Sequence, residues 1–386
     1  MIETIATPAV RGTVHPLERL DTPALLLDAD KLERNCRAMR ERMDRHHVTL
    51  RPHVKTGKSV EVAQCALGAA AGPITVSTVR EAEYFYDHGF RDILYAVGMV
   101  PQKVARLAAL VKRGARVTAI VDSVEAAQGF VAAAGAQGVS IPALIEIDSD
   151  GHRAGVRPDD PRLLEVGRAL GESLRGVMTH AGESYNCRSH GAIVAMAEQE
   201  RAAAVRAAQA LRAAGHDCPI VSVGSTPTAT FATTFEGVTE VRVGVYVFQD
   251  LVMAGLGVCE LDQLALSVLA SVIGHQRDKN WLITDAGWMA MSRDRGTASQ
   301  PVDQGYGLVC DVSGVPLGDL VVTEANQEHG IVARRDGGAI DFARHPIGSR
   351  LRILPNHACA TAAQFGEYHV LREGRPCETW DRFGGW

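Results

Sequence analysis

Short apolar runs alternate with helical patterns along the chain from about residue 30 to residue 250. Eight of these runs have the length and composition of buried strands, and they cover residues 48–51, 74–77, 93–96, 117–121, 143–147, 176–179, 220–223 and 240–243. Strands that alternate with helices favour a parallel sheet covered by helices. Because eight such units fit into about 210 residues, the pattern favours a closed (β/α)₈ TIM barrel over an open doubly wound sheet.

The segments between these runs carry residues that start and end helices. Asp30 is the expected N-cap of the first helix, and Thr78 with Glu81 predicts a capping box at the start of another. Pro101 and Gly114 bracket a further helix, since proline is favoured in the first turn and glycine just past the last. The helix signals therefore agree with the strand pattern.

The pattern changes after about residue 255, where strand-like runs are separated by Gly, Pro, Asp and Asn instead of by helices. These runs cover residues 265–273, 281–284, 320–323, 330–333, 350–354 and 368–371. An apolar run at residues 24–28 lies outside the eight barrel units and is expected to pair elsewhere. We therefore predict a barrel over residues 30–255 and an all-β domain made of residues 1–29 and 256–386.

Composition and charge narrow the functional classes. The 386 residues carry 40 Lys and Arg against 45 Asp and Glu, so the formal net charge of −5 excludes a basic nucleic-acid surface as the main function. Hydrophobic residues make up 46% and charged residues 22%, which is typical of a folded globular chain. The start has Glu3 where a signal peptide has basic residues, and no apolar run reaches the ~20 residues that a membrane helix needs. We expect a cytoplasmic protein without a membrane or nucleic-acid partner.

Polar residues follow several of the predicted strands, and the carboxyl ends of barrel strands are where active sites lie. The loops after the seventh and eighth strands contain Gly224, Ser225 and Thr226, then Gly244 and Tyr246. Such loops often bind phosphate, because a glycine exposes backbone N–H groups and the hydroxyls add donors. A plain Gly-Ser-Thr-Pro turn is the alternative, so the pattern leaves phosphate binding open.

Lys55 follows the first predicted barrel strand, directly after residues 52–54. A lysine in a loop is commonly no more than a surface residue. At a barrel mouth with a phosphate site across from it, however, a lysine is what a pyridoxal 5′-phosphate (PLP) enzyme requires, because the amine forms a Schiff base and the phosphate needs an anchor. Both interpretations stay open on these residues alone.

Most of the eight cysteines are expected to be small buried side chains, because they form no CxxC pairs and the cytosol is reducing. Cys359 differs because His357 lies two residues before it. On an extended strand the two side chains would face the same side and could bind one divalent metal, although a single HxC pair is a weak pattern. No further ligands are evident nearby, so water or substrate would fill the open positions, as in a catalytic site. A second polar cluster at residues 326–330 is either a hairpin turn or part of a site.

Several longer motifs together resemble a known family. They are Leu-Asp-Thr-Pro at residues 20–23, Arg-Pro-His-Val-Lys-Thr at 51–56, Glu-Ile-Asp at 146–148, Thr-His-Ala-Gly at 179–182, Val-Gly-Ser-Thr-Pro-Thr at 223–228 and Pro-Asn-His-Ala-Cys at 355–359. Over its whole length the chain resembles the fold-type III PLP enzymes of the alanine racemase superfamily. It is most similar to the metal-dependent D-serine dehydratases and D-threonine aldolases, and among these to the D-threo-3-hydroxyaspartate dehydratases. The resemblance implies a barrel plus a β domain, with the active site between them and commonly completed by the second subunit of a homodimer.

The resemblance also implies roles for individual residues. Lys55 would be the Schiff-base lysine and the base that removes the α-proton. Tyr185 would meet the pyridine nitrogen of PLP, His180 would lie beside the ring, and Arg153 would lie near the ring oxygen. The residues implied to hold the phosphate are Gly224, Ser225, Thr226, Gly244 and Tyr246.

By the same resemblance, His357 and Cys359 would bind the metal, with Zn²⁺ expected and Mn²⁺, Co²⁺ or Mg²⁺ as alternatives. Aldolase members tend to carry an acid where this chain has Cys359, so the thiolate favours the dehydratase branch. Glu183 and residues 186–188, which flank Tyr185, do not match the family pattern.

Three functions compete. The first is a lyase that eliminates water from a D-3-hydroxy amino acid (D-threo-3-hydroxyaspartate, D-serine or D-threonine) and releases a 2-oxo acid and ammonia. The second is retro-aldol cleavage of such a compound to glycine and an aldehyde. The third is non-catalytic PLP binding, as in the small regulators of PLP homeostasis. Those regulators consist of the barrel alone, so the predicted β domain with its HxC pair argues against the third function.

Overall fold

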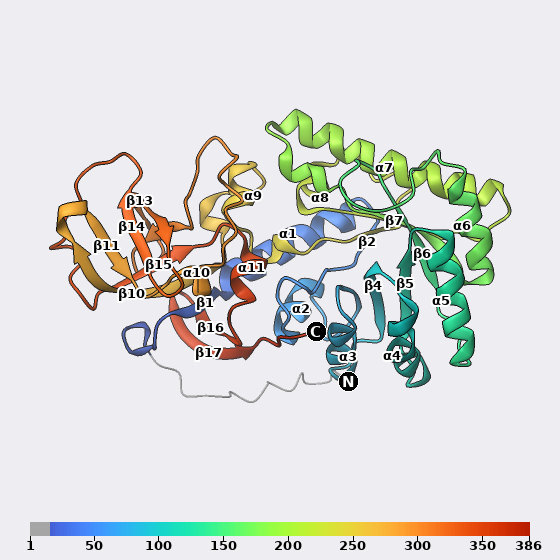
Figure 1. Ribbon diagram of the computed structural model, residues 1–386, viewed down its shortest axis with the longest axis horizontal. Coiled ribbons are helices and arrows are strands. Elements are labelled where there is room, and N and C mark those ends of the chain that lie inside the picture. Colours follow the sequence, from blue (N-terminus) through green and yellow to red (C-terminus); the bar gives the residue numbers. More distant parts are fainter. Residues whose placement is uncertain (1–15) are drawn as a thin grey trace. The chain divides into compact units, whose positions relative to one another are not determined.

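The computed structural model describes residues 16–386, which divide into two compact units (Figure 1). The barrel unit comprises Glu33–Val247, Val252–Glu260 and Gly385–Trp386. The β unit comprises the described residues up to Leu32, together with Phe248–Leu251 and Leu261–Gly384. The domain limits expected from the sequence were residues 30–255 for the barrel and 1–29 with 256–386 for the β domain, of which residues 1–15 lie outside the described part.

Eight parallel strands form the sheet of the barrel unit, in the order β2-β9-β8-β7-β6-β5-β4-β3. Their bounds are β2 Thr49–Leu50, β3 Pro73–Val76, β4 Asp92–Gly98, β5 Arg116–Val121, β6 Ala143–Ile147, β7 Leu174–Thr179, β8 Ile220–Val223 and β9 Glu240–Val241. The chain just after β2 closes the ring, because His53 pairs in parallel with Thr75 of β3. The N–H of Thr75 donates to the Pro52 carbonyl at 2.8 Å, and the N–H of Val54 donates to the Thr75 carbonyl at 2.9 Å. This closure confirms the predicted (β/α)₈ barrel.

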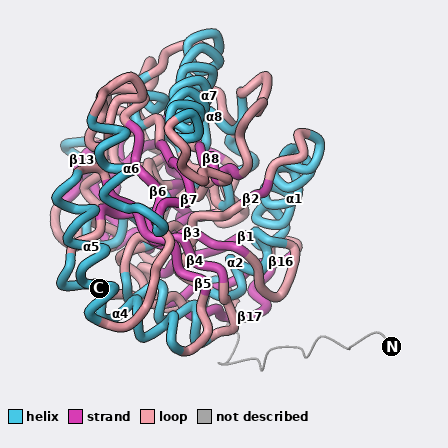
Figure 2. Tube along the Cα trace, turned by 90° about the vertical axis from the view of Figure 1, so that its right-hand side faces the viewer, coloured by secondary structure: helices cyan, strands magenta, loops and turns pink. Residues whose placement is uncertain are grey.

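Helices of this unit lie around the outside of its strands (Figure 2). They are α1 Ala29–Arg45, which starts in the β unit, and α2 Val60–Leu67, α3 Val79–Asp87, α4 Pro101–Lys112, α5 Val124–Ala136, α6 Arg162–Leu170, α7 His190–Ala213, α8 Thr226–Phe231 and α9 Leu251–Gly255, with short 3₁₀ helices at Gly171–Ser173, Gly182–Asn186 and Val245–Val247. The helix predicted between Pro101 and Gly114 is α4, and Gly114 follows it at φ +99°. This prediction is confirmed.

The helix starts are correct only in part. Asp30 lies inside α1, so the prediction that it is the N-cap was wrong. Asp28 has that role instead, because its Oδ1 accepts the N–H of Lys31 at 3.0 Å. Both residues are aspartates two positions apart, and only the helix register separates the cap from a residue of the first turn.

Half of the predicted capping box is present at α3. The Thr78 hydroxyl accepts the N–H of Glu81 at 3.0 Å. The Glu81 carboxylate, however, accepts the N–H of Ser77 at 2.6 Å instead of the N–H of Thr78. Glu81 also lies 3.3 Å from the Lys58 ammonium, so its carboxylate ties the loop after β2 to the loop after β3.

Charged residues fill part of the barrel interior. Arg51, next to β2, lies 2.7 Å from Asp92 of β4 and 2.8 Å from Glu240 of β9. The Ser222 hydroxyl donates to Glu240 at 2.7 Å and accepts from the guanidinium of Arg242 at 2.7 Å. Each buried charge therefore has a partner, which offsets the cost of removing it from water.

The β unit is built on one sheet of nine strands, in the order β11-β14-β13-β12-β15-β10-β1-β16-β17. Their bounds are β1 Ala24–Asp28, β10 Leu266–Gln276, β11 Trp281–Thr284, β12 Leu308–Cys310, β13 Pro316–Ala325, β14 Gly330–Arg334, β15 Arg350–Leu354, β16 Glu367–Arg372 and β17 Arg375–Asp381. The short helices of this unit are α10 Trp288–Met291 and α11 Ala358–Ala362, with 3₁₀ helices at Leu17–Arg19, Leu261–Gln263 and Arg277–Lys279. All pairings are antiparallel except that of β1 with β16.

Two expectations about this unit are confirmed. The run at residues 24–28 is β1, which pairs with β10 and β16 and not with the barrel. The polar cluster at residues 326–330 is a hairpin turn between β13 and β14, in which the N–H of Asn326 donates to the His329 carbonyl at 2.8 Å. Its side chains from Asn326 to His329 are exposed.

No helix among residues 16–386 combines the length and the apolar character needed to cross a membrane.

Replacing Leu26 by alanine should destabilise the β unit, because Leu26 is 0% exposed and packs with Leu269 and Leu371 at the centre of the sheet. A cavity at such a position costs about 2–5 kcal/mol of unfolding free energy. Urea unfolding followed by tryptophan fluorescence measures the loss. Val315→Ala is the control, since Val315 is 58% exposed and its loss should change stability little. Equal midpoints for the two variants would contradict the central position of β1.

Candidate functional site

Lys55 lies at the carboxyl end of the barrel, two residues beyond the pairing of His53 with Thr75. Its side chain is exposed, whereas its neighbours Val54 and Thr56 are buried. The backbone here is held by the ring closure, so the ammonium group is accessible while its stem is anchored. This is a suitable arrangement for a nucleophilic amine.

His53 lies beside this lysine in a form that carries no charge. Burial lowers the pKa of His53 well below its ordinary value, and the positive charge of Lys55 lowers it further. The Nδ1 atom of His53 is buried and has no hydrogen-bond partner among the residues that the structure describes. A buried ring nitrogen in this state is an unusual feature, and it is often found where a ligand binds.

The loop after β8 is fixed by close backbone packing. Gly224 has φ +140°, and a Cβ atom there would lie 2.3 Å from the carbonyl oxygen of Arg242, so only glycine fits. Ser225 caps α8, because its hydroxyl accepts the N–H of Thr228 while the Thr228 hydroxyl accepts the N–H of Ser225. Gly224, Ser225 and Thr226 are all buried.

Glu200 of α7 holds this loop from beneath, and sequence reasoning missed it. Its carboxylate accepts the N–H of Ala181 at 2.9 Å, the N–H of Gly224 at 3.1 Å and the Thr228 hydroxyl at 2.7 Å. Burial raises the pKa of Glu200 above its ordinary value. One signal existed, because Glu200 falls on the buried face of the helix with Ala197 and Ala204.

Two hydroxyls at this end of the barrel remain for a ligand. The N–H groups of Gly224 and Ser225, which we expected to face a phosphate, are already bonded within the protein. The hydroxyl oxygens of Thr226 and Tyr246 are buried and have no hydrogen-bond partner within residues 16–386. Burial also raises the pKa of the Tyr246 phenol, so it stays protonated and can donate.

Gly244 allows the loops after β2 and β9 to meet. A Cβ atom on Gly244 would lie 2.9 Å from the Thr56 hydroxyl and 3.0 Å from the His53 carbonyl oxygen. The chain that leads to Tyr246 therefore runs directly against the loop that carries Lys55.

His180 joins the loops after β7 and β8. Its Nδ1 lies 2.9 Å from the Gly224 carbonyl oxygen, so Nδ1 carries the proton and donates it. Burial lowers the pKa of His180 to about 3, and the ring is therefore neutral at physiological pH. Its centroid is 6.3 Å from that of Tyr185, with an angle of 47° between the rings.

The loops after β6 and β7 are also connected, through exposed groups. Arg153 lies 3.3 Å from Glu146. His152 Nδ1 lies 2.9 Å from the Glu183 carboxylate, and the N–H of Glu183 donates to Asp150 at 2.9 Å. Glu183, which did not match the family pattern, thus connects two loops that carry predicted PLP-binding residues.

His357 and Cys359 lie in the β unit, but not on a strand. Strand β15 ends at Leu354, His357 is the N-cap of α11, and Cys359 lies inside this helix. The expectation of an extended strand was therefore wrong. The two side chains are nevertheless hydrogen-bonded to each other, because a cap residue and the second residue of a helix can point the same way.

Carboxylates surround this pair. His357 Nδ1 lies 2.6 Å from Asp294 Oδ2, and the N–H of Ala358 donates to Asp250 at 3.0 Å. Burial alone lowers the pKa of His357, but the hydrogen bonds with Asp294 and Cys359 outweigh it and raise the pKa to about 11. The sequence assigned no role to Asp294, and its contact with His357 spans 63 residues, for which no local pattern exists.

Within residues 16–386, no three or more His, Cys, Asp or Glu side chains form a group that could hold a metal ion. The imidazole and thiol of His357 and Cys359 still fit a borderline-soft divalent ion such as Zn²⁺ by their chemistry. An ion on these two ligands would keep positions open for water or substrate.

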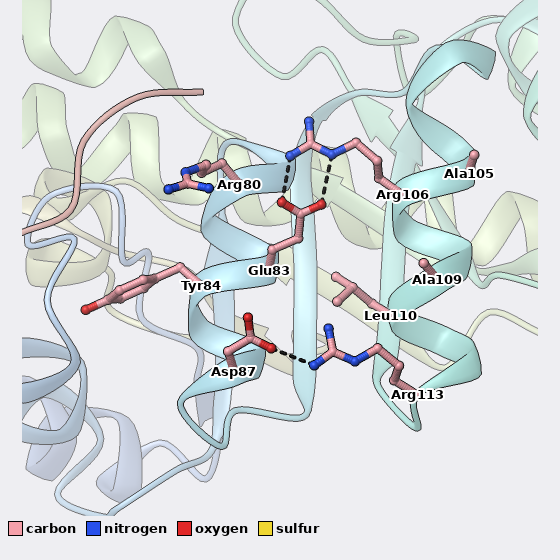
Figure 3. Close-up of a pocket in the computed structure, with 9 residues that line it drawn as sticks. All are labelled: Arg80, Glu83, Tyr84, Asp87, Ala105, Arg106, Ala109, Leu110 and Arg113. Atoms are coloured by element: carbon pink, nitrogen blue, oxygen red, sulfur yellow. Dashed lines mark hydrogen bonds and ion pairs between the residues drawn. The ribbon is translucent and has the colours of Figure 1, made fainter.

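A separate groove lies between α3 and α4 (Figure 3). Its volume is about 540 Å³, and Arg106–Glu83 and Arg113–Asp87 ion pairs cross it at 2.7 and 2.6 Å. None of the predicted site residues lines this groove. Its ion pairs are exposed and of small energetic value, so we do not assign it to the candidate site.

Comparison with known proteins matches both parts of the chain. A profile of the alanine racemase N-terminal domain family matches residues 27–251, and a profile of a serine dehydratase domain matches residues 265–371. The chain is 57% identical to a D-threo-3-hydroxyaspartate dehydratase from Delftia sp. over 95% of this chain and 98% of the relative. It is 30% identical to a D-threonine aldolase from Arthrobacter sp. over 99% and 97%.

Solved structures of the D-threo-3-hydroxyaspartate dehydratase superpose with a TM-score of 0.94 at 56% identity. One of them is a mutant with a histidine replaced by alanine and covers 97% of each chain. Another has a cysteine replaced by alanine, is in the metal-free form, and covers 96% of this chain and 100% of that chain. The barrel, the β unit and these matches together show that the chain belongs to the family of proteins with an alanine racemase N-terminal domain, in the branch that carries a serine dehydratase domain.

Proposed function

We propose that the chain is a PLP- and divalent-metal-dependent lyase that dehydrates D-3-hydroxy amino acids to a 2-oxo acid and ammonia. Its substrates are D-threo-3-hydroxyaspartate, D-serine and D-threonine. The observation that carries the proposal is Lys55, an accessible amine that the ring closure holds at the carboxyl end of the barrel. The 57% identity to a D-threo-3-hydroxyaspartate dehydratase supports the reaction and the first of the three substrates.

The barrel offers groups that fit PLP. Lys55 would bond to the aldehyde carbon of the cofactor, and the unpartnered hydroxyls of Thr226 and Tyr246 would donate to its phosphate. Tyr185 and His180 would lie against the ring. The remaining residues proposed for this site are Arg153, Gly224, Ser225 and Gly244. When bound, PLP supplies an electron sink for the charge that forms when the α-proton leaves.

The neighbouring histidines limit where protons can come from. Lys55, once the substrate amine has displaced it from the cofactor, is the base that removes the α-proton. His53 and His180 cannot protonate the leaving hydroxyl at neutral pH, because burial holds both rings in the neutral form. His180 Nδ1–H is in addition engaged by the Gly224 carbonyl. The departing oxygen therefore needs assistance from outside the barrel loops.

That assistance is the purpose we assign to His357 and Cys359. Hydroxide is a poor leaving group, and a divalent ion held by this imidazole and thiolate would act as a Lewis acid at the β-oxygen. We propose Zn²⁺, with Mn²⁺, Co²⁺ and Mg²⁺ as weaker matches to a thiolate. In the solved dehydratase mutants the replaced histidine and cysteine lie two positions apart, as His357 and Cys359 do here, and the cysteine mutant is metal-free.

Retro-aldol cleavage to glycine and an aldehyde is the alternative. The 30% identity to a D-threonine aldolase over nearly the whole chain supports it. The thiol of Cys359 and the higher identity to a dehydratase favour elimination. A homodimer, implied by the family resemblance, is part of the same proposal, and sedimentation velocity of the PLP-loaded protein measures it directly.

Lys55→Ala should abolish the visible absorption band that PLP shows when joined to a lysine, and should lower kcat by about 10²–10⁴-fold or more, because the general base is lost. Absorption spectra and turnover of the purified variant test both. The matched control is Lys58→Ala, which removes a lysine three residues further along the same loop and should keep the band. A band retained in Lys55→Ala would place the covalent bond on another residue.

Removing metal with a chelator should stop turnover while PLP stays bound, and adding Zn²⁺ should restore it. Cys359→Ala should weaken Zn²⁺ binding, whereas Cys377→Ala, a half-buried cysteine elsewhere in the β unit, should not. Metal content by mass spectrometry and turnover by ammonia release are the measurements. Full activity in the presence of the chelator would remove the role given to the metal.

Product analysis separates elimination from retro-aldol cleavage. The wild-type protein, loaded with PLP and Zn²⁺, should convert D-threo-3-hydroxyaspartate to equal amounts of ammonia and a 2-oxo acid. D-Serine and D-threonine should be converted in the same way. Glycine and an aldehyde without ammonia would establish the alternative.

A further inference from the structure

The loop between α10 and β12 is anchored beside His357. Asn356, the residue before His357, is 2% exposed. Its Oδ1 accepts the Thr297 hydroxyl at 2.7 Å, and its Nδ2 donates to the Gly305 carbonyl at 2.6 Å. These bonds fix two points of the loop to the backbone that carries His357. The loop is thus part of the surroundings of this histidine.

Asp294 extends from this anchored loop to the imidazole ring. Its Oδ2 lies 2.6 Å from His357 Nδ1, a distance typical of a strong bond between a charged acceptor and a ring N–H. The loop also contributes its own constraint, because the Asn356 side chain lies 3.4 Å from the Asp294 carbonyl oxygen. The carboxylate is therefore held in place from both its backbone and its side chain.

This contact decides which ring nitrogen is free. A carboxylate at Nδ1 keeps the proton on that atom, so Nε2 carries the lone pair of the neutral ring. The two nitrogens point in diverging directions, so a carboxylate bonded to Nδ1 lies away from an ion at Nε2. Metal-binding histidines in proteins commonly show this arrangement, in which the partner fixes the tautomer and makes the ring a stronger donor.

We propose that Asp294 is a positioning residue that orients His357 and directs a divalent metal to its Nε2 atom. The inference rests on the proposed function, since it needs the metal at His357 and Cys359. Asp294 touches neither the metal nor the substrate and acts through the imidazole. Loss of such a partner typically weakens metal binding 10- to 100-fold.

Metal affinity measures this role without using turnover. The dissociation constant of Zn²⁺ is determined on the full chain with PLP bound, by competition with a chromophoric chelator. Asp294→Ala and Asp294→Asn should both bind Zn²⁺ more weakly, with a loss of about 10- to 100-fold for the alanine variant and a smaller one for asparagine, which still accepts from Nδ1. The control is Asp303→Asn, which removes a carboxylate of the same loop that pairs with Arg295, and it should bind Zn²⁺ as the wild type does.

A second background shows whether Asp294 acts through His357. In His357→Ala, adding Asp294→Ala should cause no further loss of Zn²⁺ affinity, because the residue through which it acts is gone. A further loss of the same size would mean that Asp294 binds the ion itself and would overturn the proposal. Unchanged affinity in Asp294→Ala, even with a lower unfolding temperature, would also overturn it and leave only a structural role. Asp294→Asn keeps the side-chain shape and tests the point if the alanine variant does not fold.

The outcomes also separate this inference from the proposed function. If the wild type and His357→Ala bind Zn²⁺ equally, the metal site itself is wrong. If His357→Ala loses Zn²⁺ while Asp294→Ala and Asp294→Asn retain full affinity, the metal site stands and the role of Asp294 fails.

Discussion

The pairing of His53 with Thr75 is the interaction on which the barrel site depends. It joins the chain after β2 to β3 and closes a ring of eight parallel strands. In a closed parallel ring all carboxyl ends meet at one rim, so the loops after β2, β7, β8 and β9 converge there without any further device. Lys55 stands two residues past the closure, and its position follows from it.

Around that rim, buried polar groups are bonded to one another with few exceptions. Glu200 collects three donors from two loops, and His180 and Gly244 draw the loops after β2, β8 and β9 against their neighbours. The exceptions include His53 Nδ1 and the hydroxyls of Thr226 and Tyr246. An unpartnered buried polar group is costly, so three of them near one rim mark a place where a ligand completes the structure.

Much of this could be predicted from the sequence, because the signals were local. The period of the eight strands, the run at residues 24–28 and the motifs around Lys55 and Thr226 are short patterns with a direct physical meaning. Boundaries and distant contacts were different. Asp28 and Asp30 are chemically the same cap residue, so the choice between them depends on the helix register. His357 and Cys359 were found as a pair, yet α11 begins where an extended strand was expected. Asp294 is far from His357 in the sequence, and β12 and β17 were not predicted.

The most direct measurement is chemical trapping of the cofactor. The PLP-loaded wild-type protein is reduced with borohydride, digested, and its peptides are identified by mass spectrometry. A lysine joined to PLP is converted by this treatment into a stable secondary amine. The structure predicts that one modified peptide dominates and that it carries the label on Lys55. A label on Lys58 or on another lysine, or no label at all, would contradict the placement of the chemistry at the rim of the barrel.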